Sequence, residues 1–297
     1  MRVVRKTETY KPGQTFNIWP IGDTHLGAID TNEDLLKKHI KQIEDDPFAR
    51  IIFMGDVGDC ITHRDPRFAA GMWTQRYLQA AFEEGGIPTE VVNHAYELFK
   101  PVRDKVWVWL SGNHEKTIRK HTDREIGSEI AAALQVPYLA YNGFLRVSWK
   151  RESSKAAGGE FVTIFDLAHG WQGGRRSGAK LNQMEVELAE SDADIVLRGH
   201  SHDRVAQILP SLRIGANSVR EWNRVIAHTG TYKVGRVDTL AGDEAHTTWE
   251  ETRGFKKKTN RVLGPPIIQV TPLATPGGAS VHDGNIQSAK ADYRIIL

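Results

Sequence analysis

The chain has 297 residues, of which 40% are hydrophobic, and its formal net charge is +2. This length fits one large α/β domain, or one domain with a small appendage, and the apolar content is enough for a sizeable core. Cys60 is the single cysteine, so an internal disulfide is excluded. No apolar run reaches the ~20 residues needed to span a bilayer, and the charged start Met1–Lys6 does not resemble a signal peptide. We therefore expect a cytoplasmic protein without membrane contact. The sequence leaves its oligomeric state open.

The first half of the chain alternates apolar runs with amphipathic segments, which is typical of an α/β fold. Continuous apolar runs predict buried strands at 16–21, 50–54 and 106–110. Apolar residues at helical spacing predict helices at 32–43, 68–82, 89–99 and 122–134. Thr122 or Asp123 is a suitable cap for the last of these helices.

The second half is richer in strand patterns. We expect strands at 144–149, 161–167, 195–197, 205–209 and 225–228, a helix near 179–190 and a hairpin-like loop at 151–159. This change predicts an α/β sandwich whose two halves each supply part of one site. From Pro272 onward the chain is rich in Pro, Gly and Ser, which predicts a loosely packed C-terminal tail.

Polar side chains that bind metals well follow most of the predicted strands. Because the carboxyl ends of strands are where sites of α/β proteins collect, these side chains are expected to meet. They occur as Asp23-Thr24-His25, Gly55-Asp56, Gly112-Asn113-His114-Glu115, Ala168-His169-Gly170 and Gly199-His200-Ser201-His202. Two Asp, one Asn and four His suffice for two metal ions that share one carboxylate, and one further histidine remains for proton transfer.

Each segment alone has an ordinary alternative. Asp23 is also typical of a turn cap, and His169 of a core histidine whose hydrogen bonds are satisfied. Asp59 competes with Asp56 as the metal carboxylate, and we interpret Asp59 as a turn or helix cap. Glu115 is expected to hold a neighbour in place rather than bind metal. The shared position of the segments after strands, in one order, favours the metal site.

This order of segments, D-x-H, G-D, G-N-H-E, H and G-H-x-H between Ile18 and Asp203, resembles that of the calcineurin-like metallophosphoesterase superfamily. The resemblance implies an α/β fold, a four-layer α/β/β/α sandwich with two mixed β-sheets and a dimetal site at the C-terminal ends of the strands. We expect this domain to cover residues 1–271, with a helical insertion near 64–100 and with 272–297 as the tail.

The resemblance also implies a division of the ligands. Asp56 would bridge the two ions, and His114 would stay off them, beside the scissile phosphate. The first ion would take Asp23, His25 and His202, and the second would take Asn113, His169 and His200.

The donor types indicate which metals suit the site. Asp, Asn and His without cysteine disfavour a structural zinc cage. We expect two divalent ions, with Mn²⁺ first and Fe, Ni²⁺, Zn²⁺ or Co²⁺ suited to the same donors. Two such ions yield a hydroxide near neutral pH that attacks phosphorus in line. His114, if protonated, steadies the developing charge or donates a proton to the leaving alkoxide. The expected activity is metal-dependent hydrolysis of phosphate esters.

The substrate class is less tightly specified. The segment Asp-Thr-His-Leu-Gly is similar to the opening block of the superfamily's DNA exonuclease branch, so a phosphodiesterase or nuclease is favoured. The alternatives are a phosphomonoesterase acting on phosphoproteins or small molecules, and a metal-bearing scaffold without turnover. Four arginines that follow the metal segments are candidates to hold a phosphate ester, nucleic acid included, although a solvated surface is the equal alternative. They are Arg64, Arg119, Arg175 and Arg176. A basic run from Arg253 to Arg261 is interpreted first as solvated surface.

Overall fold

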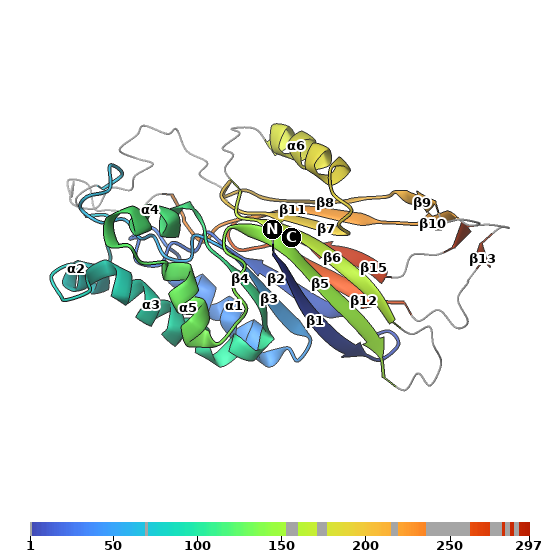
Figure 1. Ribbon diagram of the computed structural model, residues 1–297, viewed down its shortest axis with the longest axis horizontal. Coiled ribbons are helices and arrows are strands. Elements are labelled where there is room, and N and C mark those ends of the chain that lie inside the picture. The colour runs from blue at the N-terminus through green and yellow to red at the C-terminus, as the bar shows by residue number, and fades with distance from the viewer. Residues whose placement is uncertain are drawn as a thin grey trace.

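Two large mixed β-sheets pack against each other, with helices on their outer faces (Figure 1). The structure is a computed structural model of the chain. It describes residues 2–68, 71–152, 160–170, 177–214, 219–235, 262–273, 281–282, 286–287 and 291–297. The arrangement confirms the four-layer α/β/β/α sandwich that the resemblance implies. Within the described ranges, no helix is both long and apolar enough to cross a membrane.

The five-stranded sheet carries the first half of the site. Its strand order is β15-β12-β2-β3-β4. β2, β3 and β4 run parallel to one another, and β12 runs antiparallel to both of its neighbours, β2 and β15. The bounds are β2 Phe16–Ile21, β3 Ala49–Met54, β4 Val106–Leu110, β12 Ile267–Pro272 and β15 Ala291–Ile296. All five residues of β4 are buried, as the continuous apolar run predicts for a strand covered on both faces.

The six-stranded sheet carries the second half, in the order β1-β5-β6-β7-β11-β8. Its bounds are β1 Val3–Tyr10, β5 Asn142–Arg151, β6 Glu160–Ala168, β7 Ile195–Arg198, β8 Arg204–Leu209 and β11 Arg224–Thr229. A small sheet, far from the helices in Figure 1, has the order β13-β14-β10-β9. Its strands are β9 Leu212–Ile214, β10 Val219–Glu221, β13 Val281–His282 and β14 Ile286–Gln287.

Helices form the two outer layers. Their bounds are α1 Glu33–Asp45, α2 Gln75–Ala80, α3 Gly86–Phe99, the 3-10 helix η1 Lys100–Lys105, α4 Asn113–Thr122, α5 Ile126–Leu134 and α6 Ser177–Ala189. α1, α3 and α5 bury apolar side chains against the five-stranded sheet, whereas α6 packs Met184 and Leu188 onto the six-stranded sheet. A third cluster, which includes Trp149 and Phe165, fills the space between the two sheets. Burial on both sides fixes the strands, and therefore the loops at their ends.

Three expectations about elements are wrong in part. Among the described residues of the helix expected over 68–82, only 75–80 are helical, as α2, because Gly71 has φ +79° and Trp73 bridges to Ala28. The helix expected from Thr122 or Asp123 to 134 begins later, as α5 at Ile126. Thr122 is instead the last residue of α4, and Asp123, with a left-handed φ of 55°, caps the C-terminal end of that helix.

The C-terminal tail is also more ordered than expected. Residues 291–296 form β15, which pairs antiparallel with β12 along its whole length. Alternation explains this strand, since Ala291 and Tyr293 are buried and Ile295 packs against the cluster between the sheets. Loose packing is therefore wrong for these six residues, while the domain boundary at 271 and the insertion near 64–100 stay predictions.

Candidate metal centre

All seven metal-ligand candidates lie just beyond the C-terminal ends of strands, and the fold brings them to one place. Asp23 and His25 follow β2, Asp56 follows β3, Asn113 follows β4, His169 follows β6, and His200 and His202 follow β7. Three overlapping groups of side chains suited to a metal ion form there: a first of Asp23, His25 and His202, a second of Asp56, His169 and His200, and a third of His25, Asp56 and His114. In each group the candidate ligand atoms lie within 4.8 Å of one another.

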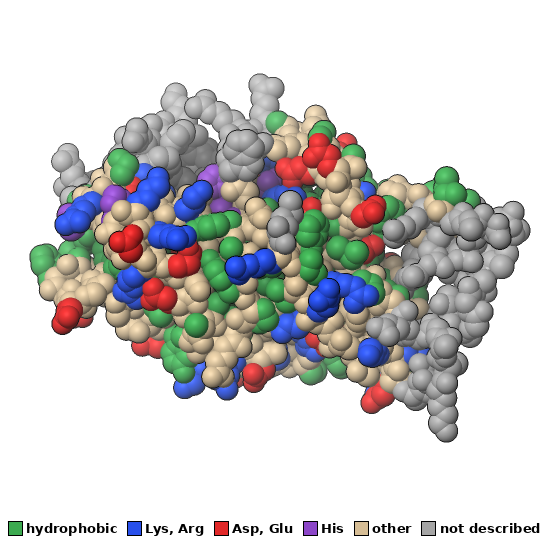
Figure 2. Space-filling model, in the orientation of Figure 1, with side chains coloured by type: hydrophobic (Ala, Val, Ile, Leu, Met, Phe, Trp, Pro, Cys, Tyr) green, Lys and Arg blue, Asp and Glu red, His purple; other side chains and the backbone are tan. Residues whose placement is uncertain are grey.

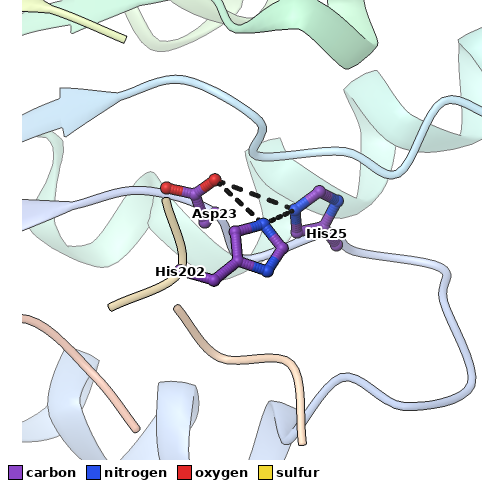
Figure 3. Close-up of side chains that lie close together, drawn as sticks. All are labelled: Asp23, His25 and His202. Atoms are coloured by element: carbon purple, nitrogen blue, oxygen red, sulfur yellow. Dashed lines mark hydrogen bonds and ion pairs between the residues drawn. The ribbon is translucent and has the colours of Figure 1, made fainter. Parts of the chain in front are cut away.

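The first group joins the exits of β2 and β7 (Figure 3). His25 Nε2 lies 3.1 Å from His202 Nε2, and His202 Nε2 lies 3.3 Å from Asp23 Oδ1. The other oxygen of Asp23 accepts the backbone N–H of His200 at 2.9 Å. Asp23 Oδ1 is buried and makes no hydrogen bond within the described part of the chain. A buried carboxylate oxygen that faces two imidazole nitrogens suits a cation.

The second group joins the exits of β3, β4, β6 and β7. His169 Nε2 lies 3.2 Å from Asp56 Oδ2 and 3.0 Å from Asn113 Oδ1. His200 Nδ1 lies 2.7 Å from the same Asn113 oxygen. Asp56 Oδ2 is also 4.0 Å from His25 Nε2, so a single carboxylate oxygen faces both groups.

Hydrogen bonds on the far side of two imidazoles point their lone pairs into the site. His169 Nδ1 lies 2.8 Å from the Met54 carbonyl, which only accepts, so Nδ1 carries the hydrogen and Nε2 faces Asp56 and Asn113 as an acceptor. His169 Nε2, Asp56 Oδ2 and Asn113 Oδ1 are then three acceptors in contact, and they require a proton or a cation between them. Burial opposes protonation of His169, but the Asp56 carboxylate outweighs it and raises the pKa of His169 to about 10. A divalent cation satisfies the same acceptors without that proton.

A carboxylate orients His25 in the same way. Asp59 is buried, and its Oδ1 lies 3.1 Å from His25 Nδ1 and 3.8 Å from Lys233 Nζ. Burial opposes ionisation of Asp59, but Lys233 and His25 outweigh it and hold the pKa of the carboxyl below its usual range. A carboxylate behind a histidine fixes the tautomer that a metal requires. The interpretation of Asp59 as a simple turn or helix cap is therefore wrong.

The loops that carry the candidates have an uncommon backbone conformation. Among described residues other than glycine, nine have positive φ, and five of these are candidate ligands. The five are Asp23, His25, Asp56, His200 and His202, with φ between 48° and 63°. Such residues cost energy, of order 1–3 kcal/mol each where strained, and persist only where the surroundings hold them. Their concentration here marks a functional site.

Glycines allow the loops to approach closely. A Cβ added to Gly112 would lie 2.1 Å from Asp56 Oδ1, and one added to Gly55, which has φ +89°, would lie 2.5 Å from the Gly112 nitrogen. Glu115 completes this contact as expected, since its carboxylate accepts the N–H groups of Gly112, Asp56 and Val57 at 2.8, 3.0 and 2.7 Å. It therefore ties the loop after β3 to the start of α4.

His114 forms the third group with His25 and Asp56 and stands beside the first two. Its backbone N–H donates to Asp56 Oδ1 at 2.8 Å, and its ring centroid is 4.5 Å from that of His25. Its Nδ1 contacts the Asp59 carbonyl, and its Nε2 lies 2.8 Å from Arg67 Nη1. Burial lowers the pKa of His114, and the carboxylates of Asp56 and Asp59 oppose this only in part.

Comparison with known families decides what kind of site this is. The profile of the calcineurin-like phosphoesterase family matches residues 16–204, which is more than half of the chain. The chain belongs to this family. A comparison with curated protein sequences finds no match. One similar solved structure is Vacuolar Protein Sorting 29 from Cryptosporidium parvum, with 14% identity, a TM-score of 0.33, and coverage of 95% of this chain and 97% of that chain.

Members of the calcineurin-like phosphoesterase family typically bind two divalent metal ions and act on phosphate esters. The acceptor-rich groups described above fit such ions. In Figure 2, histidine side chains lie among Lys and Arg side chains near the upper edge of the molecule, between the α4 and α6 sides.

Of the four arginines proposed from the sequence, the structure describes only Arg64 and Arg119. Arg175 and Arg176 lie outside the described residues, as does the basic run from Arg253 to Arg261. Arg64 is exposed, and Arg119, 60% exposed, pairs with Glu125 at 3.3 Å. Arg67, three residues after Arg64 in the same charged segment, does contact the site, because its Nη1 lies 2.8 Å from His114 Nε2.

A cleft opens beside the second group of candidates. Its volume is about 400 Å³, and its lining includes Asn113, Lys116, Tyr141, His169 and Lys180. Lys116 lies over the Tyr141 ring, with Nζ 5.6 Å from the centroid. The cleft gives a phosphoesterase space for a substituent on the phosphate.

Proposed function

We propose that this chain is a dinuclear metal-dependent phosphodiesterase, with nucleic acid as the substrate class to test first. The observation that carries the proposal is the convergence of buried ligand candidates with the Asp56 oxygen facing both groups. In this proposal one ion is held by Asp23, His25 and His202, the other by Asn113, His169 and His200, and Asp56 is shared. Mn²⁺ is the ion we expect, and Fe, Ni²⁺, Zn²⁺ and Co²⁺ suit the same donors.

Two bound divalent ions supply Lewis acidity and a water of lowered pKa. The chain's own residues supply the rest. Asp56 and Asp23 are ionised and offset the cationic charge. Burial raises the pKa of each carboxyl, but the nearby histidines outweigh burial and hold both pKa values below the usual range. Asn113 and His114 begin α4, so the positive end of that helix faces the anionic ester.

His114 is placed to act on the leaving oxygen. Its ring centroid lies 4.5 Å from that of His25, and it forms the third group with His25 and Asp56. In this proposal His114 stays off both ions and acts on the ester. Its Nε2 is the atom that faces outward to Arg67, while Nδ1 is held by the Asp59 carbonyl. A positioned imidazole contributes roughly 10²–10⁴-fold when it transfers a proton in the transition state.

The cleft supports a diester over a monoester. A diester has a second organic substituent, and Lys116, which lines the cleft beside Asn113, offers it a cation. Cations hold a phosphate backbone. A monoester has no group that requires this space.

The test compares substrates on the Mn²⁺-loaded protein. Bis-p-nitrophenyl phosphate and labelled single- and double-stranded DNA should be cleaved faster than p-nitrophenyl phosphate. Lys116→Glu should lower DNA cleavage more than p-nitrophenyl phosphate cleavage. Lys120→Glu, an exposed position on the same helix, is the matched control. Cleavage of monoesters alone would favour a phosphatase, and two bound ions without turnover of any ester would favour a scaffold.

A further inference from the structure

Arg67 is held rigidly at the edge of the site by a buried carboxylate. Its Nε donates to Asp65 Oδ1 at 3.0 Å and its Nη2 to Asp65 Oδ2 at 2.7 Å. Its backbone N–H also donates to Asp65 Oδ1, at 2.8 Å. The Asp65 side chain is only 2% exposed, whereas that of Arg67 is 22% exposed. A two-point contact of this kind fixes the plane of the guanidinium as well as its position.

The backbone around this pair is shaped to support it. Asp65 N–H donates to the Thr62 carbonyl at 2.9 Å, and Phe68 N–H donates to the Asp65 carbonyl at 2.9 Å. Pro66 stands between the two charged residues and restricts the turn that joins them. The side chain of Arg67 is therefore oriented before any ligand arrives.

The remaining nitrogen of the guanidinium faces the site. Nη1 lies 2.8 Å from His114 Nε2. Arginine only donates hydrogen bonds, and the carbonyl against His114 Nδ1 only accepts, so His114 carries its hydrogen on Nδ1 and receives one from Arg67 at Nε2. In this arrangement Arg67 donates a hydrogen bond to Nε2 of His114, the same atom that must face a leaving oxygen.

We propose that Arg67 is a substrate-binding residue, preoriented by Asp65, that exchanges His114 Nε2 for a phosphate oxygen when the ester binds. The inference rests on the proposed function and names an anion contact for that site. A phosphate oxygen is a stronger acceptor for a guanidinium than a neutral imidazole, and the bidentate contact with Asp65 leaves Nη1 to make it. The exchange frees the Nε2 lone pair of His114 to take up a proton from solvent, which it can then donate to the leaving oxygen, only when substrate is present.

The kinetic test uses the Mn²⁺-loaded full chain and bis-p-nitrophenyl phosphate. Arg67→Ala should raise KM by roughly 10- to 100-fold, the loss of one charge-assisted hydrogen bond, with the metal content unchanged. Arg67→Lys should recover only part of the loss, because an ammonium cannot make the two-point contact with Asp65. Asp65→Asn should raise KM less than Arg67→Ala. Added guanidinium chloride at millimolar concentration should restore part of the activity of Arg67→Ala and none of that of Asp65→Asn.

Arg103→Ala is the matched control, because Arg103 lies in η1, before the start of β4 and therefore at the opposite end of the sheet from the site. Its KM should equal that of the wild type. If circular dichroism shows that Arg67→Ala is unfolded, the KM values of Arg67→Lys and Asp65→Asn test the role of Arg67 instead. An unchanged KM in all folded variants of the pair, in an active wild type, would overturn the role of Arg67 alone. A wild type that binds two ions and hydrolyses no ester would instead overturn the proposed function.

A second readout needs no turnover. Nitrogen-15 NMR of the metal-free protein should show the His114 ring as the neutral tautomer with hydrogen on Nδ1. The Nε2 resonance should shift in Arg67→Ala and stay unchanged in Arg103→Ala. An Nε2 resonance identical in wild type and Arg67→Ala would contradict the contact.

Discussion

Glu115 lies at the centre of the contact between the loop after β3 and the start of α4, and replacing it by Gln tests that contact. Its Oε2 accepts from Asp56 and Gly112, and its Oε1 accepts from Val57 and Gly58 at 2.7 and 3.2 Å. An amide has one oxygen, so two of these four N–H groups lose their acceptor in Glu115→Gln, whichever way the amide is turned.

The expected loss follows from the number of unpaired groups. Each buried N–H without a partner costs about 1–3 kcal/mol, so the free energy of unfolding should fall by about 2–6 kcal/mol. The same change displaces Asp56, so metal affinity should fall by roughly 10- to 100-fold. Burial and the Asp56 charge raise the pKa of Glu115 to about 7, so the comparison belongs at pH 8, where the wild-type carboxylate is ionised.

Urea unfolding of the metal-free protein measures the first quantity, and titration with Mn²⁺ measures the second. Glu185→Gln on α6 is the control, because Glu185 is exposed, and it should change stability by less than about 0.5 kcal/mol. A Glu115→Gln protein as stable as the wild type, with the same metal affinity, would refute the reasoning.

Three further predictions concern the site and its pH dependence. Gly112→Ala should lose metal and activity because its Cβ would meet Asp56 Oδ1 at 2.1 Å, whereas Gly178→Ala, which meets nothing within 4 Å, should lose neither; equal metal content by elemental analysis would contradict this. His114→Ala should lower turnover of bis-p-nitrophenyl phosphate by roughly 10²–10⁴-fold with both ions still bound, and loss of metal would contradict its role. Burial, with a contribution from Lys180, lowers the pKa of His228 to about 4. The neutral imidazole therefore contributes its full stability above the unfolded-state pKa of ~6.5, and this contribution is lost as the pH falls toward 4. Between pH 7 and pH 5 the wild type should therefore lose about 2 kcal/mol more stability than His228→Gln, and equal losses in urea titrations would be the contrary result.

The sequence predicts the strands around the site well because each is a continuous apolar run that ends at a polar segment. The candidate ligands follow from those strand ends, since side chains at the carboxyl edge of a sheet must meet. β1 is missed because its half-buried positions include the charged Lys6 and Glu8, which hides the alternation, and its position depends on parallel pairing with β5. β15 is missed because it pairs with β12 only after a Pro- and Gly-rich segment.

The supporting residues of the site are harder to predict than the ligand candidates. Asp59 reaches His25 across 34 positions, and Arg67 reaches His114 across 47 positions. Neither pair has a spacing that a local pattern can show, because tertiary packing alone brings the partners together. The start of α4 is hidden for a different reason, since Gly112-Asn113 is equally typical of a turn.

Anomalous diffraction from crystals soaked in Mn²⁺ tests the central claim most directly. We expect two peaks, one among Asp23, His25 and His202 and one among Asn113, His169 and His200, with an Asp56 oxygen between them. A single peak, or two peaks with Asp56 bound to neither ion, would contradict the account.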